Sequence, residues 1–241
     1  MFRSVTLPWA QVPHAQRMTL NSTINRAGFL LLCVTVSALW VWVKYSSFNP
    51  RSVAIIALTC FLGATAFVWV TVCNKKWSFV TAPVVALLEG LSIGGISARL
   101  EVRYHGIAIQ AVALTFTTCL CLLVAYRSGI IRVTEKFKTG LLAATSGVAL
   151  LYLVSFCLSF LGVRTSALAG GVPGVLVSVV VVAIAGLNLA VDFDFIEQSA
   201  QAGLPRYMEW YASLGLMVTL VWLYLEILSL LTKARRAEEG N

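Results

Sequence analysis

The chain has 241 residues, of which 59% are hydrophobic and 12% charged, with a formal net charge of +8. Soluble domains carry about 25% charged residues, so this composition excludes a soluble globular domain and indicates a polytopic membrane protein. The 18 Lys and Arg residues fall almost entirely between apolar runs, where they set topology and meet anionic headgroups. We therefore expect the lipid bilayer, and no nucleic acid, as the partner of the basic residues.

The apolar runs predict an all-α protein with seven transmembrane helices in one bundle. Each gap between runs is short, so consecutive helices should be antiparallel neighbours. The predicted domains are a polar N-terminal segment over 1–26, a membrane domain over 27–231 and a charged C-terminal tail over 232–241. The helices are expected at residues 27–43, 53–73, 80–98, 107–126, 140–162, 174–194 and 208–231.

The N-terminal segment is mostly polar, and the apolar run after it is too long for the core of a cleaved signal peptide. We expect that run to act as a signal anchor. Asn21, Ser22 and Thr23 are candidates for the N-cap of the first helix. Residues 1–17 and 234–241 are expected to be disordered.

The loop between residues 127 and 138 is the strongest indicator of topology, because it carries four basic residues. Basic residues concentrate in short cytoplasmic loops, so this loop and the N-terminus are predicted to be cytoplasmic. The side of the C-terminus stays open, because a last segment that does not cross would place basic residues 233–236 inside as well.

Small residues mark one helix face and one turn. Gly90, Gly94 and Ala98 recur every four residues, the spacing that lets two membrane helices approach closely. Glu89 precedes Gly90 and should border that contact. The glycines and proline of 170–174 are expected to form an outer turn.

Two acids, Asp192 and Asp194, end the apolar run of residues 175–191. A carboxylate near hydrocarbon costs about 2.5–3.5 kcal/mol on insertion scales, which favours a functional use. Residues two apart point about 200° apart on a helix, so one acid should face the bundle and the other the aqueous boundary. The alternative is a solvated helix end that runs into Glu197.

Two further acids, Glu89 and Glu226, lie inside apolar runs. The alternative for Glu89 is a protonated carboxyl group bonded to a neighbouring backbone or hydroxyl group. Glu226 has Thr219 on its face and lies about 10 Å along the helix from Lys233, toward which it could extend. A close pair of buried carboxylates can hold a cation when ionised and release it when protonated.

No motif in the sequence indicates an enzyme. The chain lacks G-x-S-x-G and H-E-x-x-H, and its six cysteines show no C-x-x-C or Cys/His metal spacing. We therefore expect no catalytic residues and no cofactor. Glu209, close to Arg206 at the start of the last helix, is expected to interact with the helix dipole.

Several segments together resemble the Bax inhibitor-1-like family, most closely its bacterial YccA-like branch. They include Leu-Asn-Leu-Ala-Val-Asp-Phe-Asp-Phe-Ile-Glu-Gln (187–198), Tyr-Met-Glu-Trp-Tyr (207–211) and Leu-Leu-Glu-Gly-Leu-Ser-Ile-Gly-Gly-Ile-Ser (87–97). The likeness extends over about residues 18 to 233. It implies two three-helix layers around a hydrophobic last helix, in an integral protein of the bacterial inner membrane.

The resemblance also implies calcium leak across the membrane, with pH sensitivity from paired acids on the sixth and seventh helices. Asp192 matches the sixth-helix acid. The string Leu-Tyr-Leu-Glu favours Glu226 as its partner, whereas counting forward from Asp192 ends near Thr219, which would leave the partner acid missing. The family's basic latch on the second helix has Lys75 and Lys76 as candidates.

The leading hypothesis is a pH-modulated cation (calcium) leak channel or exchanger. Asp192 would be the central ion or proton ligand and Glu226 its partner, with Asp194 and Glu89 auxiliary. Oxygen ligands of this kind suit Ca²⁺ as the permeant ion. The alternative is a non-conducting membrane regulator of stress survival or of a membrane quality-control protease, which would be its protein partner.

Overall fold

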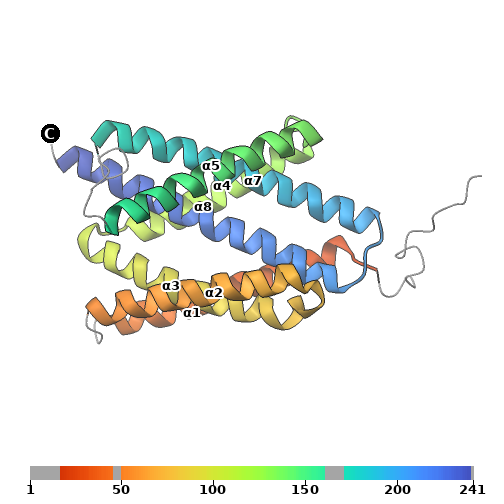
Figure 1. The fold of residues 1–241 in the computed structure, drawn as a ribbon, viewed down its shortest axis with the longest axis horizontal. Coiled ribbons are helices and arrows are strands. Elements are labelled where there is room, and N and C mark those ends of the chain that lie inside the picture. The colour runs from red at the N-terminus through yellow and green to blue at the C-terminus, as the bar shows by residue number, and fades with distance from the viewer. Residues whose placement is uncertain (1–16, 46–49, 161–170, 240–241) are drawn as a thin grey trace, which may run out of the picture. The chain divides into compact units, whose positions relative to one another are not determined.

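The computed structural model describes residues 17–45, 50–160 and 171–239, and the long elements within these ranges are all α-helices (Figure 1). A short 3₁₀ turn, η4 (Lys75–Trp77), joins the second and third helices. The prediction of an all-α protein with seven long apolar helices is confirmed. The helices are α1 (Leu20–Lys44), α2 (Pro50–Cys73), α3 (Ser78–Arg103), α4 (Ile107–Arg127), α5 (Glu135–Phe160), α7 (Gly171–Gln201) and α8 (Tyr207–Glu239).

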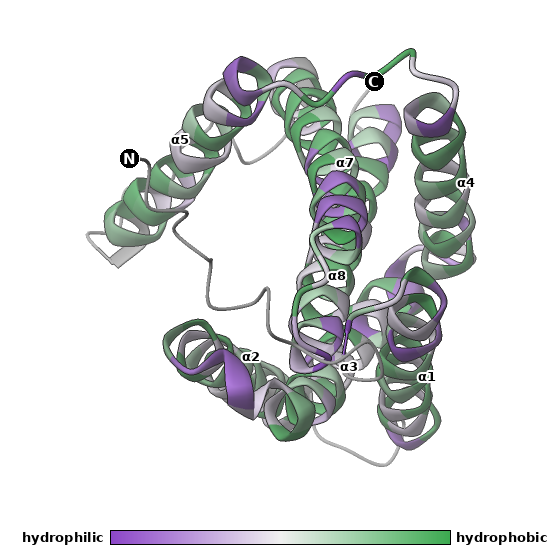
Figure 2. Ribbon diagram, turned by 90° about the vertical axis from the view of Figure 1, so that its right-hand side faces the viewer, coloured by the Kyte–Doolittle hydropathy of each residue, from purple (hydrophilic) through white to green (hydrophobic). Residues whose placement is uncertain are grey.

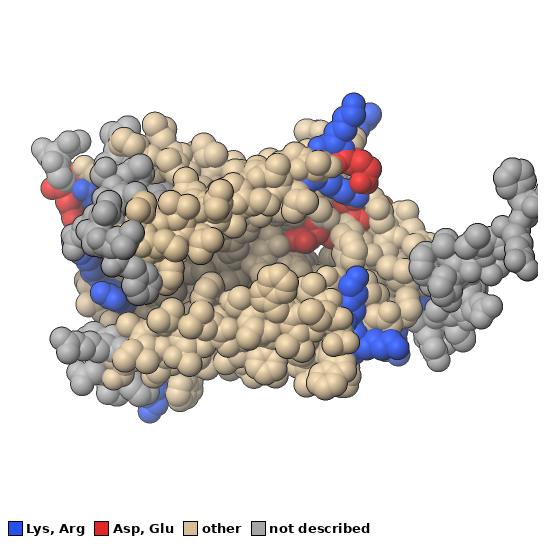
Figure 3. Space-filling view, in the orientation of Figure 1, with Lys and Arg blue, Asp and Glu red and all other residues tan. Residues whose placement is uncertain are grey.

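Each of the seven helices is long and apolar enough to cross a membrane, so the chain is an integral membrane protein with seven spans. Even the shortest, α4 with 21 residues, rises about 32 Å, which matches a hydrocarbon core of about 30 Å. Figure 2 shows hydrophobic residues along most of α4. On the face drawn in Figure 3, Lys and Arg side chains gather near the ends of helices, as the bilayer requires.

The first helix begins earlier than predicted. Its N-cap is Thr19, which has extended backbone and whose hydroxyl accepts a hydrogen bond from the backbone N–H of Ser22 at 3.3 Å. The prediction of Asn21, Ser22 or Thr23 as the cap is therefore wrong, because all three lie inside the first turn. An N-cap hydroxyl satisfies one of the four N–H groups that a helix start leaves without partners.

Two predictions about chain ends and turns are also wrong. Gly171, Pro173 and Gly174 belong to the first turn of α7 and not to an outer turn. Proline fits there because its missing N–H would have no helical partner in any case. The tail expected to be disordered from residue 234 is helical through Glu239. Gly170 and most of the expected N-terminal tail lie outside the described residues.

The chain divides into two compact units. Unit 1 comprises Met1–Ile96 and Asp192–Val218, and unit 2 comprises Ser97–Val191 and Thr219–Asn241. Helices α3, α7 and α8 each contribute residues to both units. We describe each unit by itself.

In unit 1, α3 packs closely against α1 through two glycines. A Cβ atom on Gly90 would overlap Ser37 Oγ and the carbonyl oxygen of Val34, and one on Gly94 would lie 2.8 Å from the Cα of Ala38. No side chain fits at either position without movement of the α1 backbone. The small-residue prediction for this face of α3 is therefore confirmed at Gly90 and Gly94.

On another face of α3, still within unit 1, this helix packs against α2. A Cβ atom on Gly95 would lie 3.0 Å from Val53 Cγ1 of α2. Thr71 of α2 donates its hydroxyl proton to Thr81 Oγ1 of α3 at 2.6 Å, and both side chains are buried. Helix α3 therefore contacts both α1 and α2 within this unit, as Figure 1 also shows.

In unit 2, α7 contacts both α4 and α5. A Cβ atom on Gly186 of α7 would lie 3.2 Å from Leu122 Cδ1 of α4. On another face, Asn188 Nδ2 donates to Thr145 Oγ1 of α5 at 2.9 Å. A polar contact of this kind satisfies a side chain for which the bilayer offers no partner.

Candidate ion and proton site

Asp192 lies in the body of α7, because that helix continues without a break to Gln201. Its carboxyl group faces the backbone of α8 within unit 1: a Cβ atom on Gly215 would lie 3.8 Å from Asp192 Oδ1. The solvated helix end that the sequence left as an alternative is therefore not what the structure shows. Helix α8 approaches Asp192 with a residue that has no side chain.

Asp194 is more deeply enclosed than Asp192, with 8% of its surface exposed. Its Oδ2 atom accepts a hydrogen bond of 2.7 Å from Gln198 Nε2, one turn further along α7. Asp192 is half-buried and Asp194 is buried, so the expectation that one of the two aspartates faces the aqueous boundary stays a prediction. The two carboxyl groups still leave α7 on different faces, as the helical geometry requires.

Glu89 lies in α3 beside the glycine contact with α1, as the sequence predicted. Its Oε2 atom is buried and has no hydrogen-bond partner among the described residues. The alternative of a carboxyl group bonded through this atom to a neighbouring backbone or hydroxyl group is therefore not observed. A buried carboxyl oxygen without a donor has lost its hydration with no compensating hydrogen bond, which costs free energy.

Glu226 of α8 is buried within unit 2, with 5% of its surface exposed. The hydroxyl group of Tyr152 on α5 lies 2.8 Å from both carboxyl oxygens, and Trp222 Nε1 donates to Oε1 at 3.0 Å. Lys233, toward which Glu226 could have extended, instead donates to Ser178 Oγ of α7 at 2.7 Å. Among the described residues, Glu226 is thus held by hydrogen bonds from neutral donors and not by an ion pair.

The sequence-predicted acids do not form one cluster within a unit. Asp192, Asp194 and Glu89 belong to unit 1, and Glu226 belongs to unit 2, so the pairing of Asp192 with Glu226 stays a prediction. Within the described ranges, no group of three or more His, Cys, Asp or Glu side chains could hold a metal ion. The Ca²⁺ ligands proposed from the sequence therefore stay a prediction.

The candidate latch residues lie after α2, on the 3₁₀ turn η4. Lys75 Nζ lies 5.2 Å from the ring centroid of Tyr211 on α8, a cation–π contact within unit 1. Both Lys75 and Lys76 are exposed. A contact with an acid is not among their described interactions, so the latch role stays a prediction.

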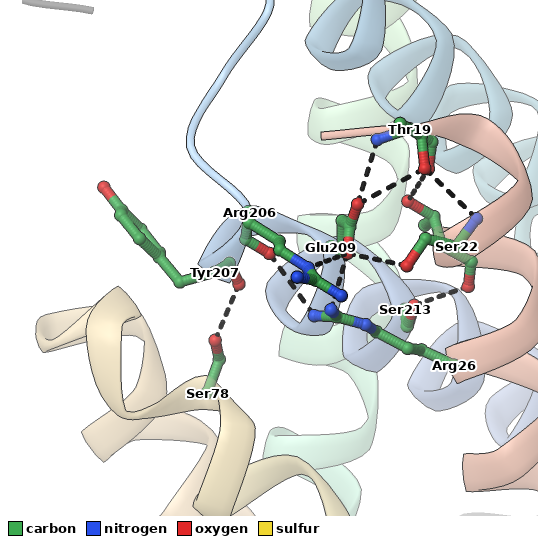
Figure 4. A network of polar contacts seen from close by, with 9 residues as sticks. Thr19, Ser22, Arg26, Ser78, Arg206, Tyr207, Glu209 and Ser213 are labelled. Carbon is green, nitrogen blue, oxygen red and sulfur yellow. Dashed lines mark hydrogen bonds and ion pairs between the residues drawn. The ribbon is translucent and has the colours of Figure 1, made fainter. Parts of the chain in front are cut away.

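The sequence underestimated Glu209, which lies at the centre of a buried polar cluster (Figure 4). Only 1% of its surface is exposed. Its carboxylate accepts hydrogen bonds from the backbone N–H of Thr19 at 2.9 Å and from Ser22 Oγ at 2.8 Å. It also forms an ion pair of 2.7 Å with Arg26 and a looser one of 3.9 Å with Arg206. We call these five residues the Glu209 cluster.

Neighbouring contacts tie the same two segments of unit 1 together. Arg26 donates to the carbonyl oxygen of Arg206 at 3.3 Å, and its guanidinium carbon lies 4.9 Å from the ring centroid of Trp210. Ser213 Oγ donates to the carbonyl oxygen of Thr23 at 2.9 Å. The Glu209 cluster therefore fastens the start of α1 to the start of α8 (Figure 4).

One sequence pattern points to part of this cluster. Thr19, Ser22 and Arg26 are spaced three and four residues apart, which places them on one face of a helix. Two hydroxyl groups and a guanidinium on one face indicate an anionic partner. The partner itself is 190 residues from Thr19, a separation that spacing cannot bridge.

Comparison of the chain with curated proteins and with solved structures gives no match. A family comparison does give one, to the family described as Bax inhibitor 1 like, over residues 2–236. That match covers nearly the whole chain and includes all seven spans. The chain therefore belongs to the Bax inhibitor 1-like family, whose members are generally non-enzymatic membrane proteins.

Proposed function

We propose that this protein is a pH-modulated cation pathway, a leak channel or exchanger for Ca²⁺, of the YccA-like branch of its family. The observation that carries the proposal is that Asp194 and Glu226 are 8% and 5% exposed and lie in α7 and α8, both membrane-spanning helices. Burial of two carboxyl groups in membrane-spanning helices costs several kcal/mol in total, and this cost supports a functional use of the acids.

The proposed roles follow the chemistry of the acids. Asp192 is the central ion or proton ligand and Glu226 its partner, with Asp194 and Glu89 auxiliary. Carboxyl oxygens bind Ca²⁺ when ionised and lose it when protonated, so ion passage depends on pH. Sparse oxygen ligands favour passage over retention, because a conducting site must bind weakly enough to release its ion.

We propose the bacterial inner membrane as the location, with the N-terminus in the cytoplasm. The loop between α4 and α5 supports this orientation, since basic residues flank and occupy it. Lys138 pairs with Glu135 at 3.1 Å, while Arg127 and Arg132 add positive charge on the same side. Short loops with this charge stay on the cytoplasmic side.

The experiment is Ca²⁺ flux into proteoliposomes that contain the purified protein, measured between about pH 6 and pH 8. We expect Asp192→Asn to lower the flux several-fold and to flatten its pH dependence, because the amide keeps the shape but cannot ionise. Glu135→Gln is the matched control, since this acid is exposed at the start of α5.

Flux and pH response that stay at the wild-type level in Asp192→Asn would remove the proposed mechanism. Absence of flux at every pH in the wild-type protein would instead support a non-conducting regulator of stress survival or of a membrane protease. In that case a membrane-protein partner should co-purify, and deletion of residues 1–17 should abolish the association.

A further inference from the structure

We propose that residues 17–19, which we call the strap, hold the turn between α7 and α8 closed, and that release of the strap opens the ion pathway at Asp192. The inference rests on the function proposed above and names a conformational device that regulates it. The strap, the turn and Asp192 all belong to unit 1. The strap has extended backbone at Thr19 and precedes the first residue of α1.

The turn receives the strap through its backbone. The N–H of Met18 donates to the carbonyl oxygen of Leu204 at 2.7 Å, and Arg17 pairs with Pro205 as an antiparallel bridge. A Cβ atom on Gly203 would lie 3.2 Å from Arg17 Cδ, and Gly203 has a φ of +63°, a conformation that favours glycine. The turn is thus shaped to accept the strap at close range.

One side chain of the strap is an apolar anchor. Met18 is 3% exposed and lies in a hydrophobic cluster with Ile196 near the end of α7 and with Met208 and Ala212 at the start of α8. Removal of this apolar surface from water stabilises the contact. The strap therefore holds the last turns of α7 and the first turns of α8 together.

The anchor lies one helical turn from Asp192. Residues three or four apart are neighbours on a helix, so Ile196 lies beside Asp192 on α7 and Ala212 lies beside Gly215 on α8. Gly215 is the residue that faces Asp192, with 3.8 Å between its added Cβ atom and Oδ1. A change in the spacing of the two helices at Met18 therefore changes their spacing at Asp192.

The structure describes the closed arrangement. Asp192 Oδ2 is buried while the backbone of α8 approaches Oδ1, so an ion reaches this carboxyl group only after α7 and α8 separate. The strap can release without the loss of α1, because Arg26 and Ser213 fasten that helix to α8 independently. A short segment outside a helix opens at a lower free energy than a packed helix does.

The first test closes the strap with a reversible bond. Met18, the residue after Arg17, bonds to Leu204, the residue before Pro205, so the bridge is a non-hydrogen-bonded pair whose Cα atoms lie about 4.5 Å apart. That separation suits a disulfide, so Arg17→Cys combined with Pro205→Cys should cross-link on oxidation. We expect oxidation to lower Ca²⁺ flux in proteoliposomes several-fold and reduction to restore it. The single variant Arg17→Cys, oxidised and reduced in the same way, is the control for the six native cysteines.

The second test weakens the strap. Met18→Ala removes the anchor, so we expect flux to rise several-fold and amide hydrogen exchange over residues 196–208 to become faster, because the turn opens more often. Leu20→Ala is the matched control: this side chain is 44% exposed in the first turn of α1, and we expect flux and exchange to equal those of the wild type. If Met18→Ala does not fold, the cysteine pair is sufficient, because it keeps Met18.

A cysteine pair that does not cross-link, or cross-linked protein whose flux equals that of the reduced protein, would overturn the inference. Unchanged exchange in Met18→Ala would do so as well. Failure of the proposed function is a separate result. Wild-type protein without Ca²⁺ flux would remove the ion pathway, while hydrogen exchange in Met18→Ala would still report whether the strap holds the turn closed.

Discussion

At the scale of single residues, the buried acids fall into two kinds according to what holds them. Glu209 is compensated by the guanidinium group of Arg26 at 2.7 Å. Glu226 accepts hydrogen bonds from neutral donors, a phenol and an indole. A cation compensates the charge of a buried carboxylate directly, whereas neutral donors supply hydrogen bonds without an opposing charge.

This distinction predicts a large effect on stability at Arg26. Arg26→Met leaves Glu209 buried beside Thr19 and Ser22 without its close cation, so we expect the free energy of unfolding to fall by about 3–5 kcal/mol. Equilibrium unfolding in mixed detergent micelles measures this loss. Arg206→Met is the control: its side chain is 65% exposed and 3.9 Å from Glu209, and we expect a loss below about 1 kcal/mol.

A second substitution tests whether the loss comes from the uncompensated charge. Combining Arg26→Met with Glu209→Leu removes both charges, and much of the stability should return. Equal losses in Arg26→Met and Arg206→Met would contradict the assignment of Arg26 as the principal partner.

The sequence predicted which acids are enclosed better than it predicted their partners. Apolar neighbours identified Glu89, Asp192 and Glu226 as intramembrane acids, because hydropathy is a local property. The two hydrogen-bond donors to Glu226 differ in whether the sequence could have predicted them. Trp222 lies one turn before Glu226 and could have been found from spacing, but Tyr152 is 74 residues away and could not. Glu209 was expected only to interact with the helix dipole near Arg206, because its partners Thr19, Ser22 and Arg26 are equally distant in sequence.

At the scale of helices, the contact between α1 and α3 depends on the absence of side chains. Gly90 meets the backbone carbonyl group of Val34 and the side chain of Ser37, and Gly94 meets the backbone of Ala38. Such proximity gains dispersion energy along the backbones, the main attraction that remains between helices in lipid. The hydroxyl group of Ser37 donates to the backbone carbonyl oxygens of Cys33 and Val34 in its own helix, so it needs no hydrogen-bond partner on α3.

Gly90→Ala should therefore destabilise the protein. The added methyl group cannot be accommodated unless α1 moves, and we expect a cost of about 1–3 kcal/mol. Gly147→Ala is the matched control, since nothing lies within 4 Å of its added methyl group on α5. Alanine favours helix over glycine, so this variant should be as stable as the wild type or more so. Thermal unfolding followed by size-exclusion chromatography compares the two.

A Gly90→Ala protein that unfolds at the wild-type temperature would contradict the close approach of α1 and α3. Helix positions and this glycine face were predictable from the sequence, because apolar periods and small-residue spacing are visible locally. Helix ends were less predictable. Thr19 caps α1 and the glycine-rich start of α7 is helical, since caps and first turns depend on which polar groups lie nearby in space.

At the scale of the whole molecule, seven crossings by the helices of the described ranges would place the start of α1 and the end of α8 on opposite sides of the membrane. Helix α8, with 33 residues, rises about 50 Å, so it is long enough to cross fully. That length disfavours a last segment that stops within the bilayer. If the N-terminus is in the cytoplasm, as we propose, we expect the end of α8 to lie outside despite the basic residues at 233–236.

This orientation can be tested with reporter fusions in a bacterial host. Alkaline phosphatase, which is active only outside the cytoplasm, should be inactive when fused after Ser128 in the loop between α4 and α5. The same reporter fused after Glu239 should be active. The reverse pattern would place the N-terminus outside, and activity at neither site would mean that α8 does not cross.

The number of spans could be predicted from the sequence at this scale, because each span is a local run of apolar residues. The pairing of acids across the chain could not. Asp192 and Glu226 fall into different units although only the end of α7, a short connection and the first part of α8 separate them in sequence. The family resemblance suggested that Asp192 and Glu226 form a pair. Measurements on these two acids have to test that pairing.

The Glu209 cluster has a consequence for how the protein is made. Arg26 enters the bilayer with the first helix, while Glu209 is translated 187 residues after Ser22. Until the ribosome has produced nearly all of the polypeptide, the guanidinium group must remain at the lipid headgroups or against the insertion machinery. The ion pair between Arg26 and Glu209 can therefore form only once the start of α8 has been synthesised, and a nascent chain that stops before α8 leaves this arginine without its carboxylate partner.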